Sequence, residues 1–290
     1  MDPMNVLWIY AHPEQRSLNG TLRATGLRAL TAAGHRVRES DLYAMNFKPV
    51  IDADDFDRPS SERLRVGAEQ ERANATGGLA PDIRAEQEKI IWADTLVLQF
   101  PLWWFGPPAI LKGWFDRVLV QGFAFGVRDA EGRTRRYGDG GLAGRRALVV
   151  TSVGARASGF GPRGIHGDFD EVLWPVLHGT LWYTGMQALH PYVVHGADRA
   201  TSADVESHAN ALARRLRALP GEEALAFRPE SGPDYDENLV LHADRAPGRS
   251  GLGAHIVRSP DVSAGDQSFR SANTSIASQT NCAVPSPCES

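Results

Sequence analysis

The order of strand-like and helix-like segments constrains the fold of this chain most. Strands are expected at residues 6–11, 37–42, 95–100, 146–152 and 188–195. Helical spacing separates them, at residues 18–33, 81–92, 109–118 and 202–219, and a further helix is expected from about Asp168. Strands that alternate with helices form parallel sheets covered on both faces. The sequence therefore predicts the α/β class, with a doubly wound five-stranded parallel sheet and helices on both faces.

Two stretches interrupt this pattern, and a third follows it. Residues 46–80 are rich in charge, Pro and Gly and predict a long irregular insertion, and residues 123–137 predict a hairpin or loose excursion. After Pro220 apolar clusters become rare, and residues 250–290 are dominated by Ser, Gly, Asn, Thr and Pro. Such a composition buries too little surface to offset chain entropy. We therefore expect one domain over residues 1–220 and a largely disordered C-terminal extension over residues 221–290.

Charge and cysteine content exclude several classes of protein. A net charge of −4 and a pI near 6.1 disfavour nucleic-acid binding, which needs a basic surface. No run approaches the ~18 apolar residues of a membrane-spanning helix, and the first residues lack the features of a signal peptide. Both cysteines, Cys282 and Cys288, fall in the polar tail, so neither a disulfide framework nor a metal site is expected. We expect a cytoplasmic protein that neither enters membranes nor binds metal.

An aromatic block predicts where a ligand binds. The expected strand at residues 95–100 ends at Pro101 and is followed by Trp103, Trp104 and Phe105, after which Gly106 and two prolines open the next helix. Open α/β sheets bind ligands at the carboxyl ends of their strands. Three consecutive aromatic residues on such a loop cannot all point inward, so a platform for a flat, mostly apolar ring is favoured over core packing. Core packing fits Trp114, which lies on the helix.

Two further loops leave strands at the same edge. The first strand ends at His12, and Ser17 and Asn19 stand where the next helix begins, a place where phosphate can bind free backbone N–H groups. The turn has neither a dinucleotide-binding nor a Walker A pattern, and taken alone Ser17 and Asn19 are better explained as helix caps than as phosphate ligands. Residues 151–154 begin a glycine-rich loop that either approaches a heterocycle or forms an ordinary turn.

Together these segments resemble a known family, the flavodoxin-like NAD(P)H:quinone oxidoreductases, which are two-electron quinone reductases. The matching blocks are HPEQRSLN from His12, ESDLYAMNF from Glu39, PLWWFGPPAILKGWFDRV from Pro101, GIHGD from Gly164 and LWP from Leu173. The similarity runs from about Val6 to Leu219, and the long aromatic block is its most specific part.

The resemblance implies a flavodoxin-like fold, a bound flavin, usually FAD, and a homodimer with two sites at its interface. It implies catalysis by His166 and flavin contacts from His12, Ser17, Leu18, Asn19, Pro101, Leu102, Trp103, Trp104, Phe105, Thr151, Ser152, Val153, Gly154 and Phe160. Substrate contacts are implied for Trp104, Phe105, Phe125, Gly126 and Tyr183. Of these, Phe125 and Tyr183 occupy positions that in the family reach across from the partner subunit.

Two positions depart from the family pattern. Phe160 stands six residues before His166, where the family has a catalytic tyrosine, so His166 must act alone or with water. Glu206 stands where the family's arginine contacts the adenosine half of FAD, which leaves FMN open as the flavin.

The resemblance also implies the reaction. NADH or NADPH passes a hydride to the flavin, and a quinone or similar flat acceptor then takes it from the same pocket in a ping-pong scheme. The alternatives are an azo- or nitroreductase using FAD or FMN, or a flavoprotein that serves as an ancillary, regulatory subunit with little turnover.

Overall fold

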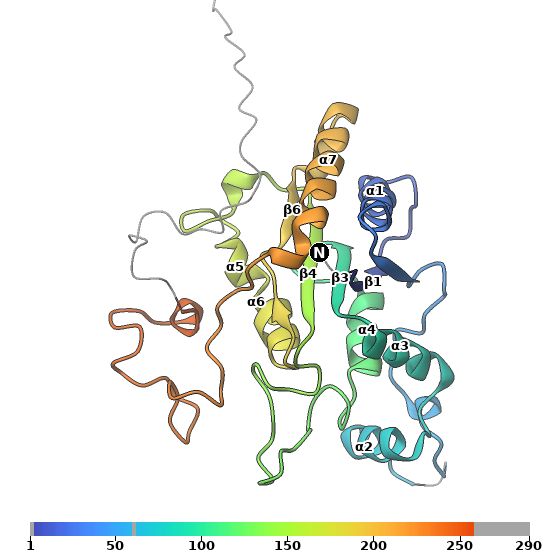
Figure 1. Cartoon of the computed structure of the whole chain (residues 1–290), viewed down its shortest axis with the longest axis vertical. Helices are drawn as coiled ribbons and strands as arrows, with labels where there is room; N and C mark the ends of the chain where they lie inside the picture. The colour runs from blue at the N-terminus through green and yellow to red at the C-terminus, as the bar shows by residue number, and fades with distance from the viewer. Residues whose placement is uncertain (1–2, 60–61, 258–290) are drawn as a thin grey trace, which may run out of the picture.

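Parallel strands form the centre of the molecule (Figure 1). The computed structural model describes residues 3–59 and 62–257. The sheet has the order β2-β1-β3-β4-β5, with β6 also pairing with β4, and every pair is parallel. This order is that of the flavodoxin-like sheets, so the predicted fold class is confirmed. The strands are β1 Asn5–Tyr10, β2 Arg36–Asp41, β3 Thr95–Pro101, β4 Arg146–Val153, β5 Gln187–Ala188 and β6 Tyr192–His195.

The fifth position of the sheet differs from the single strand predicted there. It consists of two short strands, β5 and β6, separated by Leu189, His190 and Pro191. Proline has no N–H to donate to a neighbouring strand, and the backbone N–H of Leu189 bonds to Ala147 O before pairing stops. Strand pairing with β4 therefore stops after β5 and resumes at β6, where Val153 pairs with His195.

Helices cover both faces of the sheet (Figure 1). Those on one face are α1 Leu18–Ala32 and α7 Ser202–Ala218. The other face carries α3 Pro81–Trp92, α4 Ala109–Val118, α5 Phe169–Val172, α6 Trp174–Val176 and a π-helix, Leu177–Trp182. A further helix, α2 Val66–Thr76, lies in the insertion, and short 3-10 helices lie at Ala53–Asp55, Ala157–Gly159, Ala197–Arg199, Leu219–Gly221 and Leu252–His255.

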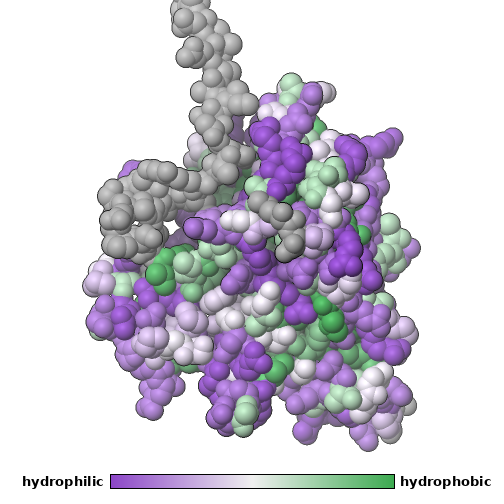
Figure 2. All heavy atoms as spheres, in the orientation of Figure 1, coloured by the Kyte–Doolittle hydropathy of each residue, from purple (hydrophilic) through white to green (hydrophobic). Residues whose placement is uncertain are grey.

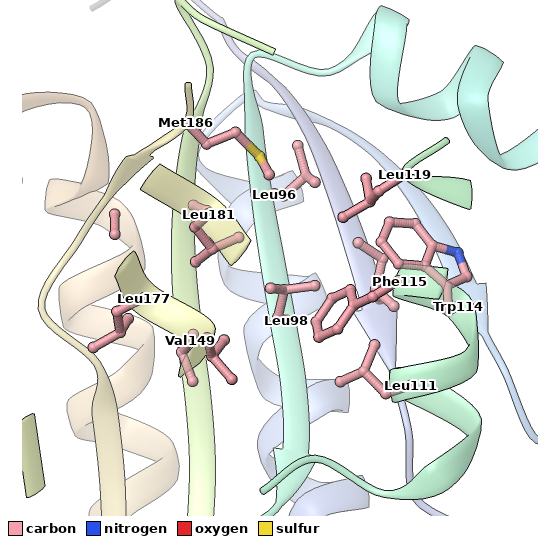
Figure 3. Close-up of a cluster of buried hydrophobic side chains, with 14 of the residues drawn as sticks. Leu96, Leu98, Leu111, Trp114, Phe115, Leu119, Val149, Leu177, Leu181 and Met186 are labelled. Atoms are coloured by element: carbon pink, nitrogen blue, oxygen red, sulfur yellow. The ribbon is translucent and has the colours of Figure 1, made fainter. Parts of the chain in front are cut away.

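Side-chain packing explains why these helices lie against the sheet. On α4, Leu111 and Phe115 point towards Leu96 and Leu98 of β3, as Figure 3 shows. On the opposite face, a Cβ at Gly26 of α1 would lie 2.3 Å from a ring atom of Trp8, so only glycine lets α1 approach the sheet so closely. The buried clusters on the two faces hold the strand ends in fixed register, and these ends carry the candidate site.

The insertion at residues 46–80 is more ordered than predicted. It contains α2 and a 3-10 helix, Ala53–Asp55, and the side chain of Asp55 is buried against the guanidinium of Arg117 on α4. Buried charges need such partners, and the sequence pattern alone does not pair residues so far apart. The predicted excursion at 123–137 holds only isolated bridges, Gln121 with Phe125 and Arg128 with Thr134.

The first half of the C-terminal extension also packs on the body. Residues 221–257 run beside α6 (Figure 1), and Leu225, Phe227 and Ala254 are buried there. The expectation of a largely disordered extension therefore does not hold for these residues, because Phe227 fills a gap beside Trp174 and Trp182. Residues 258–290, with Cys282 and Cys288, lie outside the described residues. The domain boundary near residue 220 stays a prediction.

One face of the molecule is mainly polar. The face shown in Figure 2 is largely hydrophilic, with scattered apolar patches. Within the described parts of the chain, no helix has the length and apolar character needed to cross a bilayer.

Candidate active site

A cavity opens at the carboxyl ends of β1, β3 and β4. Its volume is about 510 Å³, and it gathers ten of the residues singled out from the sequence. These are His12, Ser17, Leu18, Asn19, Pro101, Leu102, Trp103, Trp104, Ser152 and Gly154. Three loops far apart in the sequence thus meet where a doubly wound sheet binds its ligand.

A chain of buried hydrogen bonds fixes the floor of this cavity. Trp8 Nε1 donates to Gln99 Oε1 (3.0 Å), and Gln99 Nε2 donates to the backbone oxygen of Asn19 (2.8 Å). Asn19 Nδ2 then donates to Ser152 Oγ (2.8 Å). Because the chain joins β1, β3, α1 and β4, the three loops hold one relative position, which a preformed binding site requires.

The first turn of α1 presents free donors to the cavity. Ser17 Oγ accepts from the backbone N–H of Gly20 (3.1 Å) and lies 3.2 Å from His12 Nδ1. Within the described residues, the backbone N–H groups of Leu18 and Asn19 have no partner. Unpaired N–H groups at a helix start attract anions such as phosphate. Ser17 is thus a helix cap, as one reading of the sequence held, and it also lines the cavity.

The aromatic loop is a tight turn with unusual backbone geometry. Trp103 and Gly106 exchange two backbone hydrogen bonds of 3.0 Å, and Trp104 (φ 49°) and Phe105 (φ 59°) are both left-handed. Such a pair defines a type I′ turn, in which glycine or asparagine is usual. Bulky residues there cost of the order of 1–3 kcal/mol each, a strain typical of functional sites. Trp104 is 99% exposed, so it fills no core, whereas Trp114 is buried as expected.

His166 lies beside this turn. Its ring centroid is 5.7 Å from that of Phe105 and 5.0 Å from that of Phe160. The loop is held by a hydrogen bond from the His166 N–H to Gly159 O (2.9 Å). The six-residue spacing therefore does bring Phe160 and His166 into contact, but a phenylalanine ring has no hydroxyl to offer the imidazole.

The ring of His195, which the sequence did not single out, also packs against Phe160. The two ring centroids are 5.4 Å apart, and Nδ1 of His195 is buried without a partner among the described residues. Burial, followed by the charge of His208, lowers the pKa of His195. A histidine at the end of a predicted strand was the available signal, but nothing in the sequence shows that Phe160 folds over it.

Thr151 and Val153, the other singled-out residues at the end of β4, are not among the residues that line the cavity. Thr151 is fully buried and its Oγ1 has no partner in the described part of the chain, and the same holds for Oδ1 of Asn19. Val153 is half-buried at the end of β4. Unpaired buried polar atoms beside a cavity indicate a missing hydrogen-bonding ligand, because such atoms are rarely left unsatisfied.

Asp198 is a cavity residue that sequence reasoning missed. It belongs to the 3-10 helix Ala197–Arg199, and a Cβ at Gly154 would lie 2.0 Å from its Oδ2. The glycine therefore admits the carboxylate to the edge of the cavity. In the sequence, only a glycine after the last strand, Gly196, indicates the turn that precedes Asp198. In the structure this glycine has a φ of 67°.

Several singled-out residues are not among those that line the cavity. Phe105, Thr151, Val153, Phe160 and His166 belong to the loops and strand ends beside it, and four others lie elsewhere. Phe125, Gly126 and Tyr183 lie on a different part of the described chain, where Tyr183 O accepts a hydrogen bond from Tyr137 N (3.1 Å). Glu206 is exposed on α7. A search of the described residues finds no group of histidine, cysteine and carboxylate side chains that could hold a metal ion.

Comparisons with known proteins place these features among relatives. A family described as having a flavodoxin-like fold matches residues 4–218. A ribosyldihydronicotinamide dehydrogenase-like protein of Penicillium crustosum is 38% identical over 257 residues, covering 87% of this chain and 95% of that protein. NAD(P)H dehydrogenase [quinone] 1 of Rattus norvegicus is 37% identical over 227 residues, covering 78% of this chain and 81% of that protein. A crystal structure from Klebsiella pneumoniae, provisionally described as a quinone reductase, superposes with a TM-score of 0.84 at 44% identity, covering 88% of this chain and all of that one (100%).

Proposed function

The chain belongs to the flavodoxin-like NAD(P)H:quinone oxidoreductases, and we propose that it passes a hydride from NADH or NADPH through bound FAD to a quinone. The main support for this proposal is that the N-terminus of α1, the aromatic turn and the β4 loop line one cavity. A flavin dinucleotide needs an anion site and a flat apolar platform, and this cavity offers both.

The α1 end of the cavity suits the pyrophosphate. The free N–H groups of Leu18 and Asn19 supply donors, and the imidazole of His12 lies beside them. The Ser17 hydroxyl holds this turn, because it donates to Glu14 O (2.7 Å) and accepts from the N–H of Gly20. The positive end of the helix dipole favours the negative charge there. Asp198 faces the same cavity with a carboxylate that has no partner among the described residues, so it can accept a hydrogen bond from a sugar hydroxyl.

The other end suits the isoalloxazine ring. The turn at Trp103–Gly106 exposes aromatic surface. Thr151 Oγ1 and Asn19 Oδ1 are buried polar atoms without a partner among the described residues. A ring with polar edges and an apolar face satisfies both kinds of group. Pro101 to Phe105 would hold one side of the ring, and Thr151 to Gly154 would hold its polar edge.

When bound, the flavin accepts a hydride and passes it on. His166 lies at the turn that would carry the ring, so its imidazole can hold a proton near the negative charge that develops on reduction. Trp104 and Phe105 would floor the pocket for a flat acceptor. One exposed ring face can serve the nicotinamide and the acceptor only in turn, which is why we propose a ping-pong order.

We further propose a homodimer. Phe125, Gly126 and Tyr183 lie away from the cavity of their own chain, so they can complete a pocket only when they come from a second copy. Size-exclusion chromatography with light scattering tests this directly, and a monomer that turns over quinone would contradict it. The cytoplasmic location also stays a prediction.

Phe160 supports the second candidate, an ancillary flavoprotein with little turnover, because the site lacks the family's tyrosine hydroxyl. Stopped-flow reduction of the flavin-loaded protein by NADH and NADPH decides between them. A multiple-turnover assay with a quinone, an azo dye and a nitroaromatic then ranks acceptors. We expect quinone turnover, and faster reduction in Phe160→Tyr. Rapid reduction without turnover on any acceptor would favour the ancillary role.

A further inference from the structure

A second cleft lies between the C-terminal extension and the π-helix. It has a volume of about 290 Å³ and shares no lining residue with the flavin cavity. Its lining consists of Tyr137, Trp174, His178, Arg228, Glu230, Tyr235, Leu239, Leu252 and His255. The proposed function uses none of these residues, and the volume is near the lower end for small-molecule sites, ~300 Å³.

Aromatic rings form most of the wall. The imidazole of His178 stacks on Trp174 (4.3 Å, 20°) and packs against Tyr137 (5.0 Å). On the extension, Tyr235 stacks with His255 (5.8 Å, 12°). Burial, and then the charge of His255, lowers the pKa of His178 to about 4, so its ring is neutral at pH 7. Uncharged ring surfaces of this kind favour a planar apolar ligand.

Two charged residues provide a polar edge without a net charge. Arg228 donates from Nη1 to Asp234 (2.6 Å) and from Nε to Ala254 O (3.1 Å). Glu230 accepts from Arg136 at Oε2 (2.6 Å). Within the described residues, Nη2 of Arg228 and Oε1 of Glu230 have no partner. The cleft thus keeps one spare donor and one spare acceptor. Glu230 is paired with Arg136, and Arg228 shares Asp234 with Arg245, which also lies 3.9 Å from Asp244.

We propose that this cleft is a second binding site, for a small uncharged aromatic molecule that carries a carboxamide group. The ring lies among the aromatic side chains, the carboxamide N–H donates to Glu230, and its oxygen accepts from Arg228. Among the described residues, Arg228 and Glu230 each already have an ion-pair partner, which disfavours a carboxylate or an ammonium group as the ligand's polar end. The site goes beyond the proposed oxidoreductase function and does not depend on it.

A ligand in the cleft can affect the expected substrate contacts through Tyr137. Tyr137 lines the cleft, and its ring packs edge-on against Tyr183 with centroids 5.0 Å apart. Tyr137 is held in the left-handed region (φ 47°) by a hydrogen bond from its N–H to Tyr183 O. A ligand that fixes Tyr137 therefore also fixes Tyr183, one of the expected substrate contacts.

The test uses benzamide as the probe and calorimetric titration of the full-length protein as purified. We expect one benzamide per chain, with a Kd of the order of 1 mM or tighter. Toluene, which has the ring without the carboxamide, should bind at least ~10-fold more weakly, because it leaves both polar groups unpaired. Equal affinity for the two probes would contradict the assigned ligand class.

Three variants locate the binding. Leu252→Trp fills the cleft and should abolish the benzamide signal, whereas Ile91→Trp, the same kind of change at an exposed position of α3, should leave it unchanged. Trp104→Ala alters the flavin cavity and should also leave it unchanged. Loss of binding in Trp104→Ala but not in Leu252→Trp would overturn the proposal, as would no binding to the wild type. Glu230→Leu, expected to remove the preference for benzamide over toluene, keeps the test decisive if Leu252→Trp fails to fold.

Discussion

Replacing Arg117 by methionine should destabilise the protein strongly. The guanidinium is 1% exposed and bonds to Asp55 at 2.7 Å, to Asp82 at 2.6 Å and to Lys48 O at 3.0 Å. Methionine fills similar space but leaves the buried carboxylate of Asp55 without its main partner. Breaking a buried ion pair in this way costs about 3–5 kcal/mol. Because Lys48 Nζ still lies 3.1 Å from Asp55, we expect the lower end of that range.

A matched change on the same helix provides the control. Lys112→Met removes an exposed pair with Asp116, which should cost about 0–1 kcal/mol. Urea unfolding followed by circular dichroism gives both free energies. If Arg117→Met lies within about 1 kcal/mol of Lys112→Met, the buried network does not stabilise the fold as argued.

The pH dependence gives a second readout of the same network. Burial alone would raise the pKa of Asp55, but hydrogen bonds from Arg117 and Lys48 outweigh it and hold that pKa below the usual value. A carboxyl group whose pKa is lowered by folding stabilises the protein above its unfolded pKa, and this contribution is lost as the pH falls through the folded pKa. The wild type should therefore lose stability below about pH 4, and Arg117→Met should lose less over the same interval. An identical acid profile in both proteins would refute the assignment.

Three further outcomes follow from the site and the extension. His166→Gln should slow flavin reduction by NADH about 10²-fold with flavin content unchanged; an unaltered stopped-flow rate would remove His166 from the chemistry. Ser17→Ala should cost about 1 kcal/mol of stability and weaken flavin binding in a fluorescence titration, and unchanged affinity would count against the α1 anion site. A chain ending at Val257 should keep the wild-type melting temperature, whereas one ending at residue 220 should melt lower because Phe227 is lost; equal melting would contradict this.

The fold could be predicted from the sequence because the patterns that indicate strands and helices are local. Apolar runs and helical spacing predicted the strands and most helices, and the cap at Ser17 marked the start of α1. What failed depends on contacts between distant segments. The ordered insertion needs Asp55 to meet Arg117, and the packed part of the extension needs Phe227 to meet Trp174. No local pattern encodes either pair.

The same division holds for the candidate site. The aromatic block, the turn after β1 and the β4 loop could be found because each departs from ordinary composition at a strand end. Asp198 and His195 could not, because an acidic residue in a loop and a histidine in a strand are common. Their positions follow only once Gly154 admits the carboxylate and Phe160 folds over the imidazole. The left-handed backbone of Trp104 also emerges only from the folded turn.

We propose above all that the cavity between α1 and the aromatic turn binds a flavin. The most direct measurement is the absorbance spectrum of the protein after incubation with FAD and FMN and removal of free flavin, with the bound flavin identified after denaturation. We expect a yellow protein that retains one FAD per chain, and we expect less retained FAD in Trp104→Ala and Ser17→Ala. A colourless protein that binds neither flavin would contradict it.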